Sequence, residues 1–448
     1  MSESLTYDEL VSVFTEAEKP FQQFRIGAES EKFGVHAQTG APLTYSGDFS
    51  VGKVIRSLTE HFGWVESVET EGGPVLGAKR GGASVTLEPG AQFELSGEAL
   101  SDLHQVAFET YQHLEEIAPV SEELGIAWLT TGFHPSAQLS QLPWVPKQRY
   151  PIMREFLPKR GKAGLDMMQR TCTTQGNFDW TNERDGMTKV MVALKLSPLV
   201  QAWFSNAPFK EGKVDGTLSH RGVVWQNMDP ARSGLIRSLW ERPTLGYQDY
   251  VDWALDAGMF LIRRDARIIK NTGQPFRDFW VHGFEGCQAT LDDWRLHLTT
   301  LFPEVRLKNT LEVRSVDALP PDLSLASLAV WTGILYDEQA LRGAEALLAA
   351  WSYLELEGAR PALCARALHA PLFGRSGFDW AAEVLTLAQA GLERRARLNS
   401  AGEDESIYLR GAAEILDTRL VPAEKALKIY EKTGSLVEAT KIQQLTRN

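Results

Sequence analysis

Cysteine is scarce in this sequence, which has only three in 448 residues. They are Cys172, Cys287 and Cys364, and an odd number without paired spacing is typical of a reducing compartment rather than of a disulfide framework. Long apolar runs are absent as well, since none approaches the ~18 residues that span a bilayer. The opening residues are acidic and have no signal or transit pattern. These absences predict a cytoplasmic protein without a membrane segment.

The chain also lacks an excess of positive charge. Asp and Glu number 58 and Lys and Arg number 46, which gives a net charge of −12 and a pI near 5.4. Proteins that bind nucleic acid normally present a basic face, so neither a nucleic acid nor an anionic membrane is an expected partner. The glycine-rich stretch at residues 72–82 has neither the lysine ending of a P-loop nor the spacing of a Rossmann motif. The expected partners are therefore small molecules.

The hydrophobic content of 43% and the charged content of 23% are those of a soluble globular protein. A chain of this length can form two or three ordinary domains, or one large domain with an annex. Helical patterns rich in alanine, leucine and glutamate follow Asp317, at residues 323–336, 338–357, 380–398 and 423–430. We therefore expect an α+β core over residues 1–337 and a helical C-terminal annex over residues 338–448, packed on the core.

Residues 25–33 form the first informative stretch. Read as a strand, they place Glu29 and Glu31 on one face and Ile26 and Ala28 on the other. Two carboxylates ~7 Å apart repel by about 2 kcal/mol at an effective dielectric constant near 20. A solvent-facing strand tolerates this repulsion, whereas an inner face needs a cation or a retained proton. This stretch alone leaves both interpretations open.

Two further stretches carry carboxylates among strand-type residues. Residues 84–97 predict a strand, a Pro-Gly turn and a second extended piece, and they contain Glu88 and Glu94. Residues 306–317 predict one strand, whose polar face holds Arg306, Lys308, Thr310, Glu312 and Arg314. Separate strands that carry carboxylates and interleaved arginines indicate a site for a cation and a phosphate on a sheet.

Another strand is predicted at residues 170–179, where polar and apolar side chains alternate. Its polar face holds Thr171, Thr173, Gln175, Asn177 and Asp179. The alternation is typical of a half-exposed antiparallel strand. It also suits a wall that faces a substrate, because Thr, Gln and Asn side chains can donate and accept hydrogen bonds at once. The residues alone do not decide between the two.

Six blocks of the sequence, in their expected order, resemble the glutamate–cysteine ligases (γ-glutamylcysteine synthetases) of the plant and proteobacterial type. The blocks are FRIGAESEKFG, LEPGAQFELSG, PKQRYPIMR, GLDMMQRTCTTQ, FPEVRLKNTLEVRSVD and LERR. The resemblance implies a glutamine-synthetase-like fold, with a curved and mainly antiparallel sheet flanked by helices. It also implies ATP-dependent joining of the γ-carboxylate of L-glutamate to the amine of L-cysteine through γ-glutamyl phosphate, the first step of glutathione synthesis.

The resemblance also implies two or three Mg²⁺ ions, with ATP as a substrate. The candidate metal ligands are carboxylates on the acidic strands: Glu29, Glu31, Glu88, Glu94 and Glu312. The candidates for contact with the phosphates, and hence for catalysis, are Arg232 and Arg314. This chemistry requires cations that balance the charge of a transferring phosphoryl group, and it needs no protein nucleophile.

Substrate-binding residues are implied in the same way. Lys147 and Arg149 would meet a substrate carboxylate. The amino-acid pocket would be lined by neighbouring residues of one block: Met167, Met168, Arg170, Thr171 and Thr173. Trp225 and Tyr250 would lie around the acceptor amine.

The chain departs from the plant members in its cysteines. Asn271 stands at one of the positions that form a regulatory disulfide in plants, and Cys287 lies near the former partner, so thiol control is not implied. A γ-glutamyl ligase with another amine acceptor and a non-catalytic binding protein on the same fold stay open as alternatives. A two-carboxylate glycosidase would explain the paired glutamates but not the arginines between them. We expect a monomer or a weak homodimer.

Overall fold

The computed structural model describes residues 5–242, 244–264 and 267–445. Its centre is a nine-stranded sheet. The strands of this sheet are β1 (Gly27–His36), β2 (Val65–Val68), β3 (Val75–Arg80), β4 (Ala83–Leu87), β5 (Phe93–Ser96), β6 (Ile126–Leu129), β7 (Thr174–Phe178), β14 (Val305–Leu307) and β15 (Leu311–Val313). Their order is β14-β15-β7-β1-β5-β4-β3-β2, with β6 on the second half of β1, and every pairing is antiparallel.

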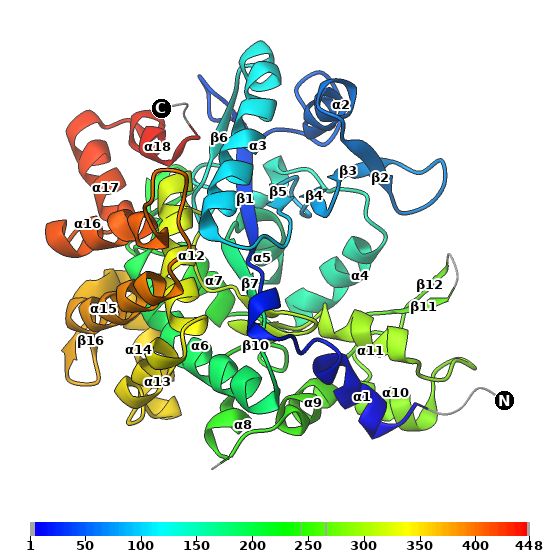
Figure 1. Ribbon diagram of the computed structural model, residues 1–448. Helices are drawn as coiled ribbons and strands as arrows, with labels where there is room; N and C mark the ends of the chain where they lie inside the picture. The colour runs from blue at the N-terminus through cyan, green and yellow to red at the C-terminus, as the bar shows by residue number, and fades with distance from the viewer. Residues whose placement is uncertain (1–4, 243, 265–266, 446–448) are drawn as a thin grey trace.

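Helices flank this sheet (Figure 1). Those that precede β14 are α1 (Tyr7–Thr15), α2 (Val51–His61), α3 (Leu103–Leu124), α4 (Arg149–Phe156), α5 (Gly164–Arg170), α6 (Glu183–Trp203), α7 (His220–Gln226), α8 (Arg237–Trp240), α9 (Tyr247–Asp256), α10 (Phe276–His282) and α11 (Leu291–Leu298). Those that follow β15 are α12 (Pro321–Leu335), α13 (Glu338–Leu347), α14 (Tyr353–Arg366), α15 (Gly377–Arg395), α16 (Arg410–Thr418), α17 (Pro422–Thr433) and α18 (Leu436–Thr440). None of these described helices has both the length and the apolar character that crossing a bilayer requires.

Short elements complete the fold. Small two-stranded pairs are β8 (Phe209–Lys210) with β9 (Lys213–Val214), β10 (Ser233–Gly234) with β13 (Phe302–Pro303), β11 (Ile262–Arg264) with β12 (Arg267–Ile269), and β16 (Pro371–Leu372) with β17 (Arg375–Ser376). The 3₁₀ turns are Phe21–Gln23, Leu139–Gln141, Leu157–Lys159, Ala367–His369, Glu405–Leu409 and Lys441–Gln443.

The last strand predicted from the sequence is in fact a hairpin. Its strands β14 and β15 pair Arg306 with Glu312 and Leu307 with Leu311, and the backbone N–H of Lys308 donates to the carbonyl of Thr310 at 3.0 Å. The prediction of one strand over residues 306–317 is therefore wrong, because the chain reverses at this three-residue tip. The reversal places the apolar side chains of the hairpin on the helix-covered face of the sheet, while its charged side chains share the opposite face.

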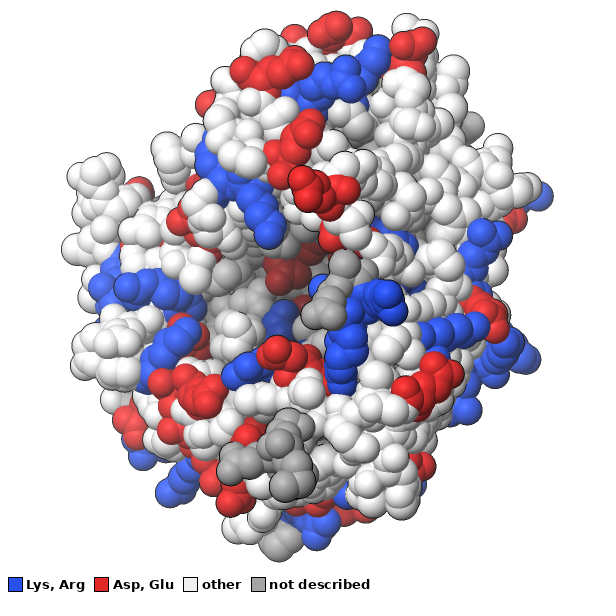
Figure 2. All heavy atoms as spheres, turned by 90° about the vertical axis from the view of Figure 1, so that its right-hand side faces the viewer, with Lys and Arg blue, Asp and Glu red and all other residues white. Residues whose placement is uncertain are grey.

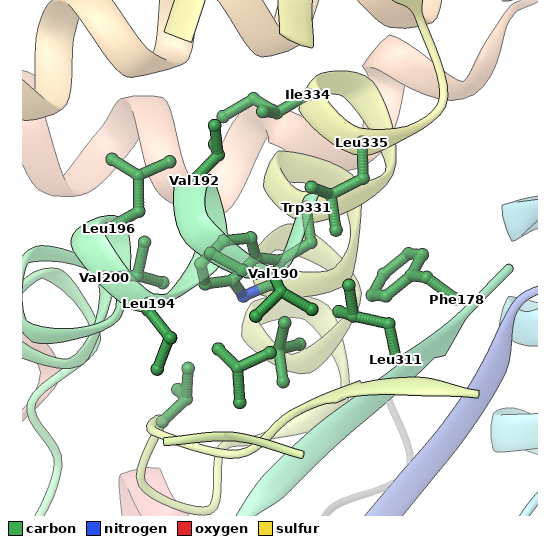
Figure 3. Close-up of a cluster of buried hydrophobic side chains, with 14 of the residues drawn as sticks. Phe178, Val190, Val192, Leu194, Leu196, Val200, Leu311, Trp331, Ile334 and Leu335 are labelled. Carbon is green, nitrogen blue, oxygen red and sulfur yellow. The ribbon is translucent and has the colours of Figure 1, made fainter. Parts of the chain in front are cut away.

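The apolar face of β7, β14 and β15 packs on two buried helices, α6 and α12 (Figure 3). Phe178 of β7 and Leu311 of β15 contact this layer, and both side chains are fully buried. Gly176 of β7 lies so close to Leu328 of α12 that a Cβ atom there would be 2.8 Å from a methyl group. The strands are thus apolar toward the helices, and their polar side chains are left for the opposite face.

Helix α12 is the centre of the C-terminal helical layer. All its residues from Ser324 to Leu335 are buried, between β7 on one side and α13, α15 and α16 on the other. The single helix predicted over residues 338–357 is two helices, because Ser352 caps a new start by accepting a hydrogen bond from the N–H of Glu355. One continuous apolar core joins residues on both sides of position 337, and the domain boundary there stays a prediction.

Candidate active site

A row of carboxylates lies across neighbouring strands on the polar face of the sheet. Glu31 of β1 is directly opposite Glu94 of β5, and Glu29 lies between Ser96 of β5 and Gln175 of β7. Seen from the side on which α4 and β11–β12 project, the surface has a hollow with Asp and Glu side chains in its depth and Lys and Arg side chains around it (Figure 2). The interpretation of residues 25–33 as a plain solvent-facing strand does not hold.

Glu29 is held by two side-chain amides of β7. Asn177 Nδ2 donates to its Oε1 at 2.7 Å, and Gln175 Nε2 donates to its Oε2 at 3.1 Å. Burial raises the pKa of Glu29 to about 7, and the charges of Glu312 and Glu94 add to the rise. At neutral pH this carboxyl group is therefore partly protonated. Of the polar face predicted on residues 170–179, Gln175 and Asn177 lie beside the acidic row.

Glu31 is surrounded by other acids. Its Oε2 accepts the backbone N–H of Thr173 at 2.9 Å. Burial raises its pKa well above the usual range, and the charges of Glu94 and Glu88 raise it further. Like charges directly opposite each other on a sheet are destabilising, so this part of the face favours a bound cation or a proton.

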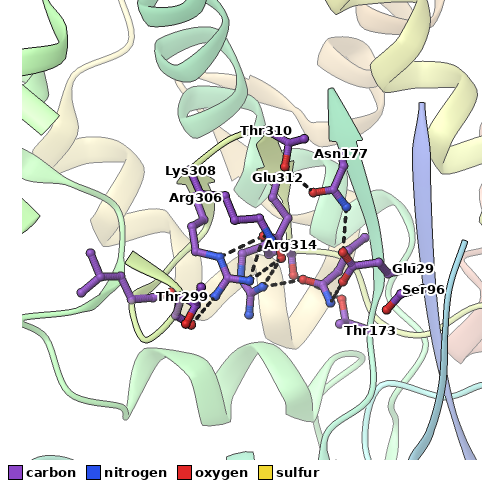
Figure 4. A network of polar contacts seen from close by, with 12 residues as sticks. Glu29, Ser96, Thr173, Asn177, Thr299, Arg306, Lys308, Thr310, Glu312 and Arg314 are labelled. Carbon is purple, nitrogen blue, oxygen red and sulfur yellow. Dashed lines mark hydrogen bonds and ion pairs between the residues drawn. The ribbon is translucent and has the colours of Figure 1, made fainter. Parts of the chain in front are cut away.

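Glu312 lies in the opposite electrostatic setting, among three cations (Figure 4). Arg306 donates to both of its oxygens at 2.8 and 2.9 Å, Lys308 Nζ lies 2.9 Å from Oε2, and Arg314 pairs with Oε1. Burial alone would raise the pKa of Glu312, but these three cations outweigh burial and hold it well below the usual range. The structure thus places Glu312 as the anchor of a cation cluster, Arg306, Lys308 and Arg314, rather than as a free ligand.

Arg314 is supported from behind by buried charges that the sequence interpretation missed. Arg221 of α7 donates to the carbonyls of Arg314 and Ser315 at 2.7 and 2.8 Å. The N–H of Arg314 donates to the carbonyl of Glu304 at 3.1 Å, and the Glu304 carboxylate pairs with Arg360 of α14. The charge of Arg221 also offsets that of Glu31. A lone arginine at a helix start gives no signal of such a role in sequence.

The residues predicted to meet a substrate carboxylate lie beside the acidic row. Lys147 Nζ and the guanidinium carbon of Arg149 are 5.6 and 5.3 Å from the ring centre of Tyr150. The hydroxyl of Tyr150 donates to the carbonyl of Leu87, the residue before Glu88, at 2.9 Å. Burial lowers the pKa of Lys147, and the charge of Glu88 opposes that shift. The start of helix α4 and the end of strand β4 therefore lie together at one edge of the site.

Most of the residues predicted to line the amino-acid pocket make contacts within the protein instead. Helix α5 continues to Arg170, whose guanidinium bonds Asp166 and Glu211 and whose side chain is buried. Met167 and Met168 are buried in the apolar core, and the hydroxyl of Thr171 bonds the carbonyl at Met167. The prediction that these four line a pocket is corrected, because the two methionines pack in the core and the polar groups of Arg170 and Thr171 already have protein partners.

Thr173 is the exception in that block, because its backbone N–H holds Glu31. Its hydroxyl is used internally, donating to the carbonyl of Val316 at 2.6 Å. The strand over residues 170–179 was predicted too early in the chain: β7 begins at Thr174, after the helix.

Two other predicted contacts are enclosed by protein. Arg232 has no exposed surface; it bonds Asp229 and the carbonyls of Thr300 and Gly258 and stacks on Phe260. Tyr250 is likewise fully buried. In this structure neither side chain can touch a substrate, which corrects both predictions.

Tyr250 and Trp225 have structural contacts near the site. The hydroxyl of Tyr250 accepts the N–H of Leu307 at 3.0 Å and so holds the β14–β15 hairpin. Trp225 is half-buried, and the guanidinium carbon of Arg221 lies 5.5 Å from its ring centre. Trp225 therefore lies next to the residues that support Arg314.

The acidic row suits a hard cation that is completed by a ligand. Within the described ranges, no three His, Cys, Asp or Glu side chains converge as they would in an all-protein metal site. Mg²⁺ is usually bound by one or two carboxylates, waters and the phosphates of a substrate, so it does not require such a cluster. The oxygen donors of Glu31, Glu88 and Glu94, and the repulsion between them, fit that ion.

Comparison with known proteins identifies the family of this chain. Residues 25–442 match the glutamate–cysteine ligase family 2 (GCS2). Glutamate–cysteine ligase A, chloroplastic, of Oryza sativa subsp. indica is 41% identical over 436 residues, which are 96% of this chain and 86% of that protein. The chloroplastic glutamate–cysteine ligase of Nicotiana tabacum is 40% identical over 443 residues, 98% of this chain and 82% of that protein.

A solved structure has the same fold. Glutamate–cysteine ligase from Francisella tularensis in complex with AMP matches with a TM-score of 0.55 and 12% identity, over 95% of this chain and 88% of that chain. The similarity confirms the predicted glutamine-synthetase-like fold. The plant relatives are named chloroplastic, which contradicts the expectation of a cytoplasmic protein. By sequence and by fold, this chain belongs to the glutamate–cysteine ligase family 2.

Proposed function

We propose that this protein joins the γ-carboxylate of L-glutamate to the amine of L-cysteine at the expense of ATP, through γ-glutamyl phosphate. The observation that carries the proposal is the division of charge on one sheet face. Glu31, Glu88 and Glu94 gather at the β1–β5 side, and the cation cluster gathers at the β15 side. A ligase of this kind must hold metal-bound phosphates and substrate carboxylates within reach of each other.

The chemistry needs activation because a carboxylate oxygen is a poor leaving group. The γ-phosphoryl group of ATP is transferred to the glutamate γ-carboxylate, which releases ADP. The amine nitrogen of cysteine then attacks the acyl carbon, the C–O bond to phosphate breaks, and the amine loses a proton. Neither step needs a nucleophile from the protein, in agreement with the buried state of Cys172 and Cys364.

In this proposal the acidic row holds Mg²⁺ through Glu31, Glu88 and Glu94, and the ion supplies charge neutralisation on the phosphates. Arg314 and Lys308 would turn part of their hydrogen bonding from Glu312 to phosphate oxygens, which accept from arginine in pairs. Glu312 keeps these side chains in place, and Glu29 keeps Gln175 and Asn177 oriented. The proposal includes two or three Mg²⁺ ions.

Lys147 and Arg149 are proposed to hold a substrate carboxylate at the rim. Both lie beside the acidic row, and Arg149 is exposed to solvent, so a ligand can reach it. The acceptor site would lie between this rim and the acidic row. The predicted monomer or weak homodimer is kept as part of the proposal.

The test is release of phosphate from ATP with single components left out. Release should need Mg²⁺, glutamate and an amine together, and mass spectrometry should find γ-glutamylcysteine. Cysteine should have the highest kcat/KM, and 2-aminobutyrate should replace it because the size is kept while the sulfur is lost. Glu115→Gln on α3, an exposed position outside the site, is the matched control for Glu31→Gln. Phosphate release that is independent of glutamate would refute the proposal.

A further inference from the structure

The hydrogen-bond ladder between β1 and β7 is opened at its end. Gly27 lies opposite Asn177, so the register makes Arg25 and Asp179 the next facing pair. Odd-numbered residues of β1 direct their backbone groups at β7, as the N–H of Glu31 does, so this pair should exchange two backbone hydrogen bonds. Neither bond forms between these two described residues. A side chain from another element takes their place.

The hydroxyl of Tyr336 lies between the two strands at this point. It accepts the N–H of Asp179 at 2.6 Å and donates to the carbonyl of Arg25. The N–H of Arg25 donates instead to Asp179 Oδ2 at 2.7 Å, and Lys189 Nζ donates to the carbonyl of Asp179 at 3.0 Å. All four backbone groups of the pair therefore have partners, and the hydroxyl holds the strands apart.

The ring of Tyr336 is fixed from three sides. Its centre lies 4.8 Å from that of Phe24 and 5.4 Å from that of Phe178. The guanidinium carbon of Arg395 lies 5.3 Å from the ring centre, and Arg395 is itself paired with the buried Glu405 at 2.8 Å. Burial and the charge of Asp179 raise the pKa of Tyr336 well above its usual range, so the hydroxyl keeps the proton that it donates.

The block LERR, residues 392–395, holds the end of α12 at which Tyr336 lies. Its last residue, Arg395, covers the ring of Tyr336. Arg394 Nη2 donates at 2.6 Å to Asp337, the residue that follows Tyr336. The block is one of the six that resemble the family, and both of its arginines are used to fix this tyrosine rather than to bind a ligand.

Asn177 connects the opened ladder with the site (Figure 4). It precedes Asp179 by two residues, and a Cβ atom on the facing Gly27 would lie only 3.2 Å from its own Cβ. Asn177 Nδ2 donates to Glu29 at 2.7 Å, and its Oδ1 accepts the hydroxyl of Thr310 at 2.8 Å. Asn177 thus joins the acidic row to the β14–β15 hairpin, and a shift of β7 against β1 would disturb both.

We propose that Tyr336 is a positioning residue of the active site, whose hydroxyl sets the spacing of β1 and β7 and so the place of Asn177 and Glu29. The proposal rests on the function proposed above, in which the acidic row holds the cation. Tyr336 is buried and acts through the ladder, not on a substrate. Without the hydroxyl, the carbonyl of Arg25 and the N–H of Asp179 would bond each other and draw the strands together, or stay buried without partners.

Tyr336→Phe tests the proposal, because it removes the hydroxyl and keeps the ring. The first measurement is binding of Mn²⁺ alone to the full-length protein, followed by electron paramagnetic resonance, which needs no turnover. Mn²⁺ prefers the same oxygen ligands as Mg²⁺. Residues that orient metal ligands typically affect affinity or activity by about 10–100-fold, so the variant should bind Mn²⁺ about tenfold more weakly. Its kcat/KM for ATP at saturating Mg²⁺ should also fall about tenfold.

Tyr45→Phe is the matched control. The hydroxyl of Tyr45 also donates to a strand carbonyl of this sheet, that of Val75 in β3, at 2.8 Å. Both variants lose such a bond, but only Tyr336→Phe changes the β1–β7 ladder, so Tyr45→Phe should keep wild-type Mn²⁺ affinity and kcat/KM. If Tyr336→Phe has a lower melting temperature but wild-type values of both quantities well below it, Tyr336 is merely structural and the proposal is overturned.

A second variant covers the case in which Tyr336→Phe does not fold. Arg394 is partly exposed, so Arg394→Gln loosens the end of α12 without opening the core, and it should weaken Mn²⁺ binding about threefold or more. Wild-type affinity in this variant would then overturn the proposal. Wild-type protein that binds Mn²⁺ but releases no phosphate from ATP would refute the proposed ligase function alone, because the comparison of Mn²⁺ affinities still decides the role of Tyr336.

Discussion

Replacement of Glu31 and of Glu312 by glutamine, one at a time, should change the stability of the metal-free protein in opposite directions. Both side chains belong to the same sheet face, and glutamine keeps shape and hydrogen bonding while removing charge. Glu31 faces other carboxylates, whereas Glu312 is surrounded by Arg306, Lys308 and Arg314. The stability change therefore reports the electrostatic setting of each position.

The magnitude for Glu31 follows from its raised pKa. Glu31 and Glu94 are directly opposite across the sheet, and two carboxylates ~5.5 Å apart repel by about 3 kcal/mol at an effective dielectric constant of 20. Burial and, after it, this repulsion raise the pKa of Glu31 in the folded protein, so the destabilisation is absent below the unfolded pKa and fully present above the folded pKa. Because Arg221 and Arg314 offset part of it, Glu31→Gln should be more stable than wild type by about 1 kcal/mol at pH 9 and equal at pH 4.

The stability change expected for Glu312→Gln has the opposite sign. Its depressed pKa means that its contribution is fully present above the unfolded pKa and is lost only as the pH falls through the folded pKa. Breaking a buried ion pair by removing one partner costs about 3–5 kcal/mol, and here three cations lose their partner. We expect Glu312→Gln to lose about 3 kcal/mol at pH 7, toward the lower end because Lys308 is partly exposed.

The assay is urea unfolding in EDTA at several pH values, with Glu115→Gln as a surface control that should change by less than about 0.5 kcal/mol. In the presence of Mg²⁺, both site variants should lose about 10²-fold in turnover, which corresponds to about 2.7 kcal/mol. If Glu312→Gln is as stable as wild type, or if Glu31→Gln is less stable than the control at pH 9, the described division of charge is wrong.

Three further outcomes follow from buried groups. Burial lowers the pKa of Lys32, on β1, to about 8, so the charge of Lys32 destabilises the fold below that pH, and this destabilisation disappears as the pH rises toward 10.5. Lys32→Met should therefore stabilise the protein by up to about 3 kcal/mol at pH 7, and an unchanged melting temperature would contradict this. Arg221→Lys keeps the charge but cannot span two carbonyls, so kcat/KM should fall about tenfold and stability by about 1–3 kcal/mol, and wild-type kinetics would refute the supporting role. All three cysteines are free and two are buried, so activity should change less than about twofold between reducing and mildly oxidising buffer; an intramolecular disulfide found by mass spectrometry would disprove it.

The sequence predicts the polar faces of the strands better than their number. Residues 306–314 were expected on one strand and lie on a hairpin, yet their even-numbered side chains still share a face. The reason is the register: Arg306 pairs with Glu312, and paired residues of antiparallel strands point to the same side. Period-2 alternation therefore identifies a face even where the chain reverses. The turn itself gives only a weak signal, because Asn309 favours turns but no glycine accompanies it.

The partners of charged residues could not be read from sequence. The five glutamates were predicted as one class, and the structure divides them, because only tertiary contacts bring Arg306 and Lys308 to Glu312 and leave Glu31 facing Glu94. Arg170 was misplaced for a related reason. Helix α5 ends at Arg170, where a strand was predicted to begin, and the guanidinium of Arg170 bonds Asp166.

The packing of helix α12 limits where this chain can be cut without exposing its apolar core. A chain cut after residue 337 would uncover the side of α12 that α13, α15 and α16 cover, and an exposed apolar face of that size promotes aggregation. Arg360 would leave with the removed piece, and Glu304 would keep a buried charge without its partner. We therefore expect the regions before and after residue 337 to melt together in one cooperative transition. A destabilising substitution in the C-terminal helices should then also affect the backbone position of Arg314, which bonds Glu304.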